Sequence, residues 1–163
     1  MNSTVPLQEI SFVAIPLSDE FAEHIRATGR DDFGRPAQVV SAAGGEPVRD
    51  QLRRATPGER LFLASYQAVP LPSAFAEIGP VYVCAEPSPT QLQWRDELPA
   101  GYFNRTFALR AYNAANEIID STLVEPALAA DLIRRWLARM DVAYLHARFA
   151  GHGCYACRFE RAE

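Results

Sequence analysis

The fold of this chain is decided by residues 142–161, which read VAYLHARFAGHGCYACRFER. Two β-prone runs, which between them contain Val142, two tyrosines and two phenylalanines, flank Gly151, His152 and Gly153. Such runs favour strands, while the glycines favour a turn. The stretch therefore predicts a C-terminal β-hairpin. Two of the three histidines and two of the three cysteines fall on it. We therefore look for chemistry here first.

The register of this hairpin determines which side chains meet. A two-residue or a four-residue turn pairs the strands in the same register and places His146 opposite Cys157, about 5 Å apart at Cβ. A three-residue loop would shift the register and break this pair. Four more side chains share the predicted face of His146 and Cys157: Tyr144, Arg148, Tyr155 and Phe159.

Outward from the hairpin, the chain reads mainly as strands. Strands are expected over residues 10–17, 38–41, 60–67, 81–85, 105–112 and 117–124. Ser18 is the expected N-cap of a helix that ends near Gly29. Apolar residues at helical spacing predict a second helix over 126–140, with Trp136 and Met140 in the core. We predict one α+β domain, residues 1–163, with a mainly antiparallel sheet, about two helices and a loose tail over residues 1–9.

Composition excludes several functional classes. The chain has 163 residues and a formal charge of -4, and all 16 basic residues are arginine. Without lysine there is no Schiff-base chemistry on lysine and no Walker-type phosphate loop. The arginines form no basic stripe, so we expect no nucleic-acid partner. No apolar run approaches the ~20 residues that span a bilayer, so we expect no membrane partner.

The chain also suggests its compartment. Its first residues lack the pattern of a signal peptide, and three cysteines are an odd number for a disulfide framework. We expect free thiols in a bacterial cytoplasm, where an arginine-rich composition is common in organisms with GC-rich genomes.

Four blocks carry a family resemblance. They are ATPGERLFL at 55–63, GPVYV at 79–83, LRAYN at 109–113 and GCYACR at 153–158. In this order and spacing they resemble the uncharacterised bacterial family catalogued as domain of unknown function 1203, from about residue 35 to the C-terminus. The resemblance implies a small single-domain bacterial protein. It implies no activity, ligand or catalytic residue.

The first hypothesis for the hairpin is an activated thiol. His146 opposite Cys157 would lower the pKa of the thiol and make a nucleophile or a redox group, with Cys154 as a second candidate and Arg148 to hold an anionic substrate. The competing interpretation is that Cys157 and His146 are packing residues in a buried aromatic layer, because free cysteine is usually buried.

Metal binding is the second hypothesis. His146, His152, Cys154 and Cys157 supply four zinc-type donors. In a regular strand, however, residues three apart point to opposite faces, so Cys154 and Cys157 chelate together only if their segment turns. We assign no metal and no cofactor.

A third group of residues suggests a polar pocket. Arg110 and Tyr112 share a strand face and are expected to meet Tyr66 and Arg158; a solvated outer face is the alternative. His152, between two glycines, reads as an exposed turn residue where a ligand can approach the backbone.

These patterns favour binding of a small molecule or a protein partner through the hairpin face. The candidate ligand-binding residues are Arg148, Tyr155, Arg158, Arg110, Tyr112, Tyr66 and His152. The alternative is a thiol-dependent enzyme or redox protein that uses Cys157 or Cys154 with His146. A homodimer with the hairpin face as its interface is the third hypothesis. The residues leave open whether the protein is an enzyme.

Overall fold

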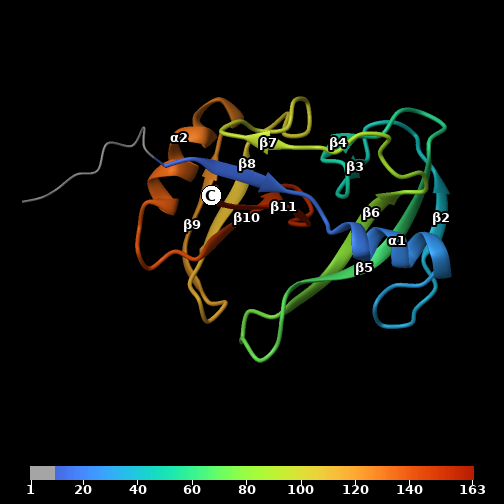
Figure 1. Ribbon diagram of the computed structural model, residues 1–163, viewed down its shortest axis with the longest axis horizontal. Helices are drawn as coiled ribbons and strands as arrows, with labels where there is room; N and C mark the ends of the chain where they lie inside the picture. The colour runs from blue at the N-terminus through green and yellow to red at the C-terminus, as the bar shows by residue number, and fades with distance from the viewer. Residues whose placement is uncertain (1–9) are drawn as a thin grey trace, which may run out of the picture.

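The computed structural model describes residues 10–163, which form two β-sheets that are each covered by one helix (Figure 1). The expected tail over residues 1–9 lies outside the described residues. The six-stranded sheet has the order β7 (Trp94–Arg95), β1 (Phe12–Ile15), β11 (Tyr155–Arg161), β10 (Tyr144–Phe149), β8 (Phe107–Tyr112), β9 (Ile118–Val124). The five-stranded sheet has the order β2 (Gln38–Ser41), β5 (Arg60–Val69), β6 (Glu77–Cys84), β3 (Pro47–Val48), β4 (Arg53–Arg54).

The pairing pattern confirms the predicted α+β class. Neighbouring strands in the described residues run antiparallel, except that β3 pairs with β6 in parallel. The two helices, α1 (Asp19–Thr28) and α2 (Pro126–Leu137), match the expected number. The chain contributes β1 to the six-stranded sheet, builds the five-stranded sheet, and then returns to complete the first.

Helix α1 begins and ends where its capping residues predict. The Ser18 hydroxyl accepts a hydrogen bond from the Phe21 amide at 3.1 Å, which satisfies one free N–H of the first turn. Gly29 closes the helix with φ of 66°, a left-handed conformation that suits glycine. Phe21 and Ile25 are buried, so this helix anchors the five-stranded sheet.

Helix α2 is shorter than its apolar pattern predicts. It ends at Leu137 rather than residue 140, and Met140 is fully exposed, so its predicted place in the core is wrong. The guanidinium of Arg161 accounts for the early end, because it donates to the carbonyls of Leu137, Arg139 and Val142. These carbonyls therefore have hydrogen-bond donors without a further helical turn to supply them. Trp136 is buried, as predicted.

Strand β6 begins earlier than expected. It starts at Glu77, and Gly79 and Pro80 lie inside it. At Pro80, β6 pairs with β5 along one edge only, because β3 meets the other edge further along, at Tyr82. A proline, which lacks an N–H, is tolerated at such an edge position. This longer β5–β6 hairpin brings Glu77 to the six-stranded sheet.

The C-terminal hairpin forms as predicted, but with a bulge that changes its register. Near the turn, Arg148 pairs with Tyr155, as the predicted register requires. Beyond the bulge, Ala147 pairs with Cys157 and His146 pairs with Arg158. The predicted opposition of His146 and Cys157 is therefore wrong. One extra residue in a strand turns all later side chains to the other face.

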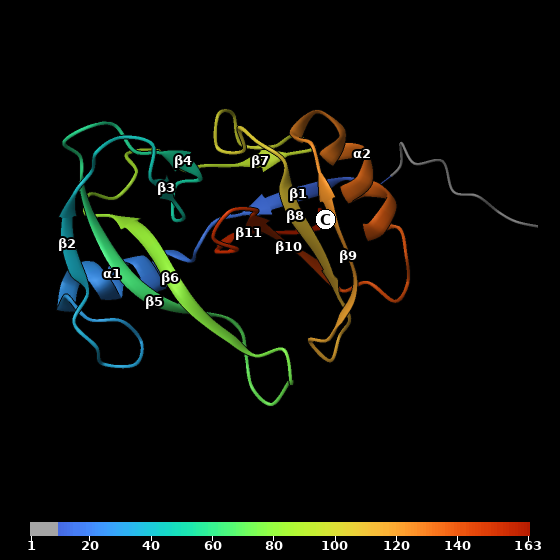
Figure 2. The same cartoon turned by 180° about the vertical axis from the view of Figure 1, so that it is seen from behind.

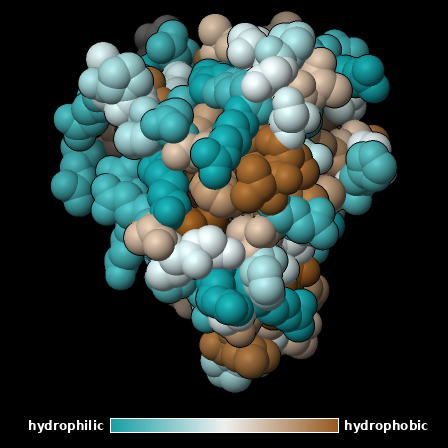
Figure 3. Space-filling view, turned by 90° about the vertical axis from the view of Figure 1, so that its right-hand side faces the viewer, coloured by the Kyte–Doolittle hydropathy of each residue, from teal (hydrophilic) through white to brown (hydrophobic). Residues whose placement is uncertain are grey.

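The two largest hydrophobic cores follow from this arrangement. The larger one lies between α2 and the six-stranded sheet and contains Cys157 and Phe159. The smaller one lies between α1 and the five-stranded sheet and receives Tyr155 from β11. Figure 2 shows β10 and β11 in the middle of the molecule, between β6 and α2. The end with β2 and α1 is mainly hydrophilic around a small apolar patch (Figure 3).

Candidate functional site

The face of the six-stranded sheet opposite α2 carries a regular grid of polar and aromatic side chains. In its central row, His146 of β10 pairs with Arg110 of β8 on one side and with Arg158 of β11 on the other. The row above pairs Tyr144 with Tyr112. The row below contains Arg148 and Tyr155. We call Arg110, His146, Arg148 and Arg158 together the arginine face.

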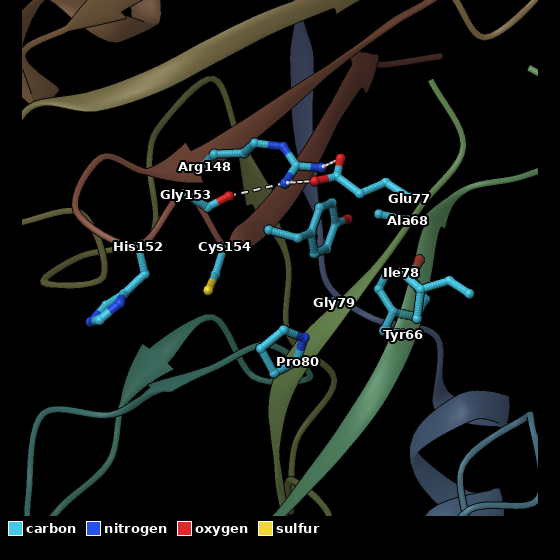
Figure 4. Close-up of a pocket in the computed structure, with 11 residues that line it drawn as sticks. Tyr66, Ala68, Glu77, Ile78, Gly79, Pro80, Arg148, His152, Gly153 and Cys154 are labelled. Carbon is cyan, nitrogen blue, oxygen red and sulfur yellow. Dashed lines mark hydrogen bonds and ion pairs between the residues drawn. The ribbon is translucent and has the colours of Figure 1, made fainter. Parts of the chain in front are cut away.

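Arg148 is the most deeply buried charge of the arginine face. Its Nη1 donates to Glu77 Oε1 at 2.8 Å and to the carbonyl of Gly153 at 3.0 Å, and its Nη2 pairs with Glu77 Oε2 (Figure 4). Arg110 Nη1 lies 3.5 Å from the same Oε2. One carboxylate therefore serves two guanidinium groups, and it comes from the other sheet.

Arg158 is held differently. Its Nε donates to Glu160 Oε1 at 2.5 Å, and its guanidinium lies 3.8 Å from the centroid of the Tyr144 ring. Stacking on an aromatic face fixes a guanidinium plane without using its N–H donors. Its Nη groups therefore remain available for an acceptor.

His146 lies at the centre of the arginine face and is 1% exposed. The rings of Tyr112, Tyr144 and Tyr155 surround it, with centroids 4.8 to 5.0 Å from its own. Burial, together with the charges of Arg158, Arg148 and Arg110, lowers the pKa of His146 to about 3. At neutral pH the imidazole is uncharged.

Unpartnered polar atoms concentrate at this one place. Among residues 10–163, three buried side-chain nitrogen or oxygen atoms have no hydrogen-bond partner: Tyr112 Oη, His146 Nδ1 and Arg148 Nε. All three belong to the grid. Each such atom costs about 1–3 kcal/mol, so a cluster of three in one site calls for an explanation.

A small cavity adjoins the arginine face. It measures about 180 Å³ and lies between β5, β6 and the β10–β11 turn (Figure 4). Arg148, Glu77, Tyr66 and Tyr155 contribute to its walls, together with the backbone of β6. The cavity is smaller than the roughly 300 Å³ at which sites for drug-sized ligands begin.

A second, larger cavity of about 500 Å³ lies beside α1. Its buried charges are already paired, since Arg26 Nη2 meets Asp50 Oδ2 at 2.6 Å and Asp50 Oδ1 accepts from the Cys84 amide. It offers no unpartnered buried group, so we place the candidate site at the arginine face.

The structure places Cys157 away from this site and Cys154 beside it. Cys157 is fully buried on the opposite face, in the core under α2, and burial raises its pKa well above the ordinary thiol value. Cys154 is half-buried and lines the cavity near Arg148. His152 lies exposed at the rim of the same cavity. Within the described part of the chain, no group of three or more histidine, cysteine, aspartate or glutamate side chains is arranged so that it could hold a metal ion.

The thiols are expected to differ in reactivity. Alkylation of the native protein should modify Cys154 and leave Cys84 and Cys157 intact, because both are buried and burial raises the pKa of Cys84 to about 12. Mass spectrometry of the labelled peptides measures this, and labelling in denaturant, where all three react, is the control. Native labelling of Cys157 would contradict the observed register.

The grid unites most of the residues named from the sequence. Arg110, Tyr112, Arg148, Tyr155 and Arg158 lie on it, and Tyr66 packs on Tyr155 with ring centroids 5.3 Å apart.

Sequence reasoning missed Glu77 and the supporting role of Tyr144. The signal for Glu77 is weak, because it precedes Gly79-Pro80, and the expected strand began only after these two residues.

The fold and the candidate site define the class of protein: it is an α+β protein of two mainly antiparallel sheets, with the arginine face where they meet. The model of the family described as "Protein of unknown function (DUF1203)" matches residues 45–161. The chain belongs to this family, as the resemblance predicted. No curated protein and no solved structure matches it. No helix in residues 10–163 is long and apolar enough to cross a membrane.

Proposed function

We propose that this protein binds a small anionic molecule at the arginine face. The observation that carries the proposal is the cluster of three unpartnered buried polar atoms, Tyr112 Oη, His146 Nδ1 and Arg148 Nε. A ligand with several acceptor atoms would pair with the two donors, and its own hydroxyl or amide would pair with the imidazole nitrogen.

Charge favours an anion. Three guanidinium groups of the face meet two carboxylates, those of Glu77 and Glu160, while His146 is uncharged. One positive charge remains in excess, and at the buried Arg148 a charge-assisted hydrogen bond is strong.

Burial favours a small molecule over a protein partner. The side chain of Arg148 is 4% exposed and His146 is deeply buried, so a protein surface would not reach them without opening the sheets. The adjoining cavity of about 180 Å³ admits a molecule of a few non-hydrogen atoms.

The compartment and source are part of the same proposal. We assign the protein to a bacterial cytoplasm, and support comes from its three free thiols and its arginine-only set of basic residues. Two predictions from the sequence remain predictions: that the protein binds no nucleic acid, and that it forms a homodimer through the hairpin face. Cys154, beside the cavity, keeps the thiol-enzyme hypothesis open to the alkylation experiment.

The test is stabilisation by anions. At constant ionic strength, sulfate, phosphate, formate, acetate and propionate are each titrated against the native protein, and Tm is followed. A ligand that binds only the folded state raises Tm as its concentration passes Kd. We expect at least one of these anions to do so.

Arg158→Gln is the informative variant. It removes one half-exposed guanidinium and leaves those of Arg110 and Arg148 in place, and a lost charged hydrogen bond of about 1.5–3 kcal/mol weakens binding roughly 10- to 100-fold. Arg60→Gln, at an exposed position of β5 away from the face, is the matched control and should bind like the wild type. Equal loss in both variants, or no response to any anion, would contradict the proposal.

A further inference from the structure

We infer that the ligand of the arginine face is a small carboxylate, and that its carboxylate group takes the place of Glu77 on Arg148 and Arg110. This inference rests on the proposed function and names the class of its ligand. Its basis is the way in which the protein already holds a carboxylate of its own at this site.

Glu77 occupies Arg148 incompletely. Its two oxygens meet Nη1 and Nη2, the end of the guanidinium, and Nε has no partner although it is buried. The side-on edge, formed by Nε and one Nη, is equally suited to a bidentate carboxylate. A carboxylate that is not tethered to β6 can bind this edge and satisfy the atom that Glu77 leaves unpaired.

The two partners differ in their access to solvent. The side chain of Arg148 is 4% exposed, whereas that of Glu77 is 39% exposed. Loss of its carboxylate partner would leave Arg148 as an unpaired buried charge at a large cost, whereas Glu77 can turn outward into water at little cost. The ion pair is arranged so that the acid is the member that can leave.

The position of Glu77 in the fold supports this asymmetry. Glu77 is the first residue of β6 and pairs with Val69, directly after a register shift in the β5–β6 ladder. A strand end beside an irregular register is held by fewer backbone hydrogen bonds than a strand interior. Movement of Glu77 therefore leaves the central β5–β6 pairing intact.

The shape of the site favours a planar carboxylate with a short tail. Arg148 presents the flat fork that matches two coplanar oxygens, and Arg110 approaches one of them from the neighbouring strand. Beside it, the cavity is walled by Tyr66, Tyr155 and Ala68, whose apolar surfaces suit a short hydrocarbon group. Glu77 also lines this cavity, so a ligand inside it reaches the same guanidinium.

Chemical rescue tests the exchange. Glu77→Ala removes the methylene and carboxylate that acetate replaces atom for atom, and leaves Arg148 without its carboxylate. In chloride buffer we expect a lower Tm than that of the wild type. Acetate should then restore Tm and bind the variant at least tenfold more tightly than the wild type, where Glu77 competes at an effective concentration in the millimolar range or above.

The controls separate class, site and fold. Glu97→Ala, an exposed acid away from the face, should show no rescue. Glu77→Ala combined with Arg148→Met should lose the acetate response. If Glu77→Ala does not fold, Glu77→Gln keeps the shape without the charge and takes its place. In ¹⁵N spectra, the Nε–H signal of Arg148 should shift on addition of acetate, because Nε gains an acceptor.

Each outcome decides one question. Rescue by acetate beyond that by phosphate or sulfate at equal ionic strength supports the inference. Equal or better rescue by the tetrahedral anions overturns the carboxylate class and leaves the anion site standing. Anion binding by the wild type without any gain in Glu77→Ala overturns the exchange alone. No response in either protein overturns both the inference and the proposed function.

Discussion

Acidification from pH 6.5 to 4.5 is expected to lower the free energy of unfolding of the wild type by about 2–3 kcal/mol more than that of His146→Gln. The pKa of His146 is about 3 in the folded protein, against an ordinary value of 6.5. Below pH 6.5 the unfolded chain therefore binds a proton that the folded chain does not. Stability from this group is complete above pH 6.5 and is lost as the pH falls toward 3, at about 1.4 kcal/mol per unit.

Urea unfolding at several pH values measures this difference. Carboxylates titrate in the same range, but they are common to both proteins and cancel in the comparison. The same substitution at exposed His152 is the control. Identical pH slopes for the wild type and His146→Gln would mean that the folded protein accepts a proton at His146, which contradicts a buried, uncharged imidazole among three arginines.

Phe159→Ala is expected to lower the free energy of unfolding by about 3–5 kcal/mol. Phe159 is fully buried in the core under α2, and its ring meets that of Phe12 edge-on, with centroids 5.8 Å apart. Truncation removes the ring and leaves a cavity between the sheet and the helix, which the rigid strands cannot close. Denaturant unfolding with unchanged m-value measures the loss.

The matched control is Leu128→Ala. Leu128 lies on α2 and is 61% exposed, so its truncation should change stability by less than about 0.5 kcal/mol. A similarly small effect at Phe159 would contradict its place in the core under α2, where the bulge in the hairpin puts it. The pair of variants thus tests the bulge as well as the core.

Local signals predicted the parts of the fold that local interactions determine. Ser18 and Gly29 set the ends of α1, because the hydroxyl cap and the left-handed glycine act within one turn. The hairpin around Gly151 was likewise visible. The end of α2 was not, because the helix is stopped by Arg161, which lies on another strand, 24 residues after Leu137.

The candidate site likewise has residues that local patterns predicted and residues that they missed. Alternation along β8 grouped Arg110 with Tyr112. Of the neighbours expected for them, Arg158 lies in the same row as Arg110, and Tyr66 packs on Tyr155. Alternation failed for Cys157 because a bulge leaves no reliable mark in sequence: Ala156 is as compatible with a regular strand as with an irregular one. Glu77 was missed because its role depends on contact between two sheets, which no single strand reveals.

The place of β1 in its sheet has a consequence for how the chain folds. Phe12 pairs with Arg161, 149 residues later, and β1 lies between β11 and β7. During synthesis β1 stays without its main neighbour until almost the whole described chain has emerged, while the strands of the five-stranded sheet are all available earlier. We therefore expect the five-stranded sheet to form first. Closure of the six-stranded sheet, with its high contact order, then sets the overall folding rate.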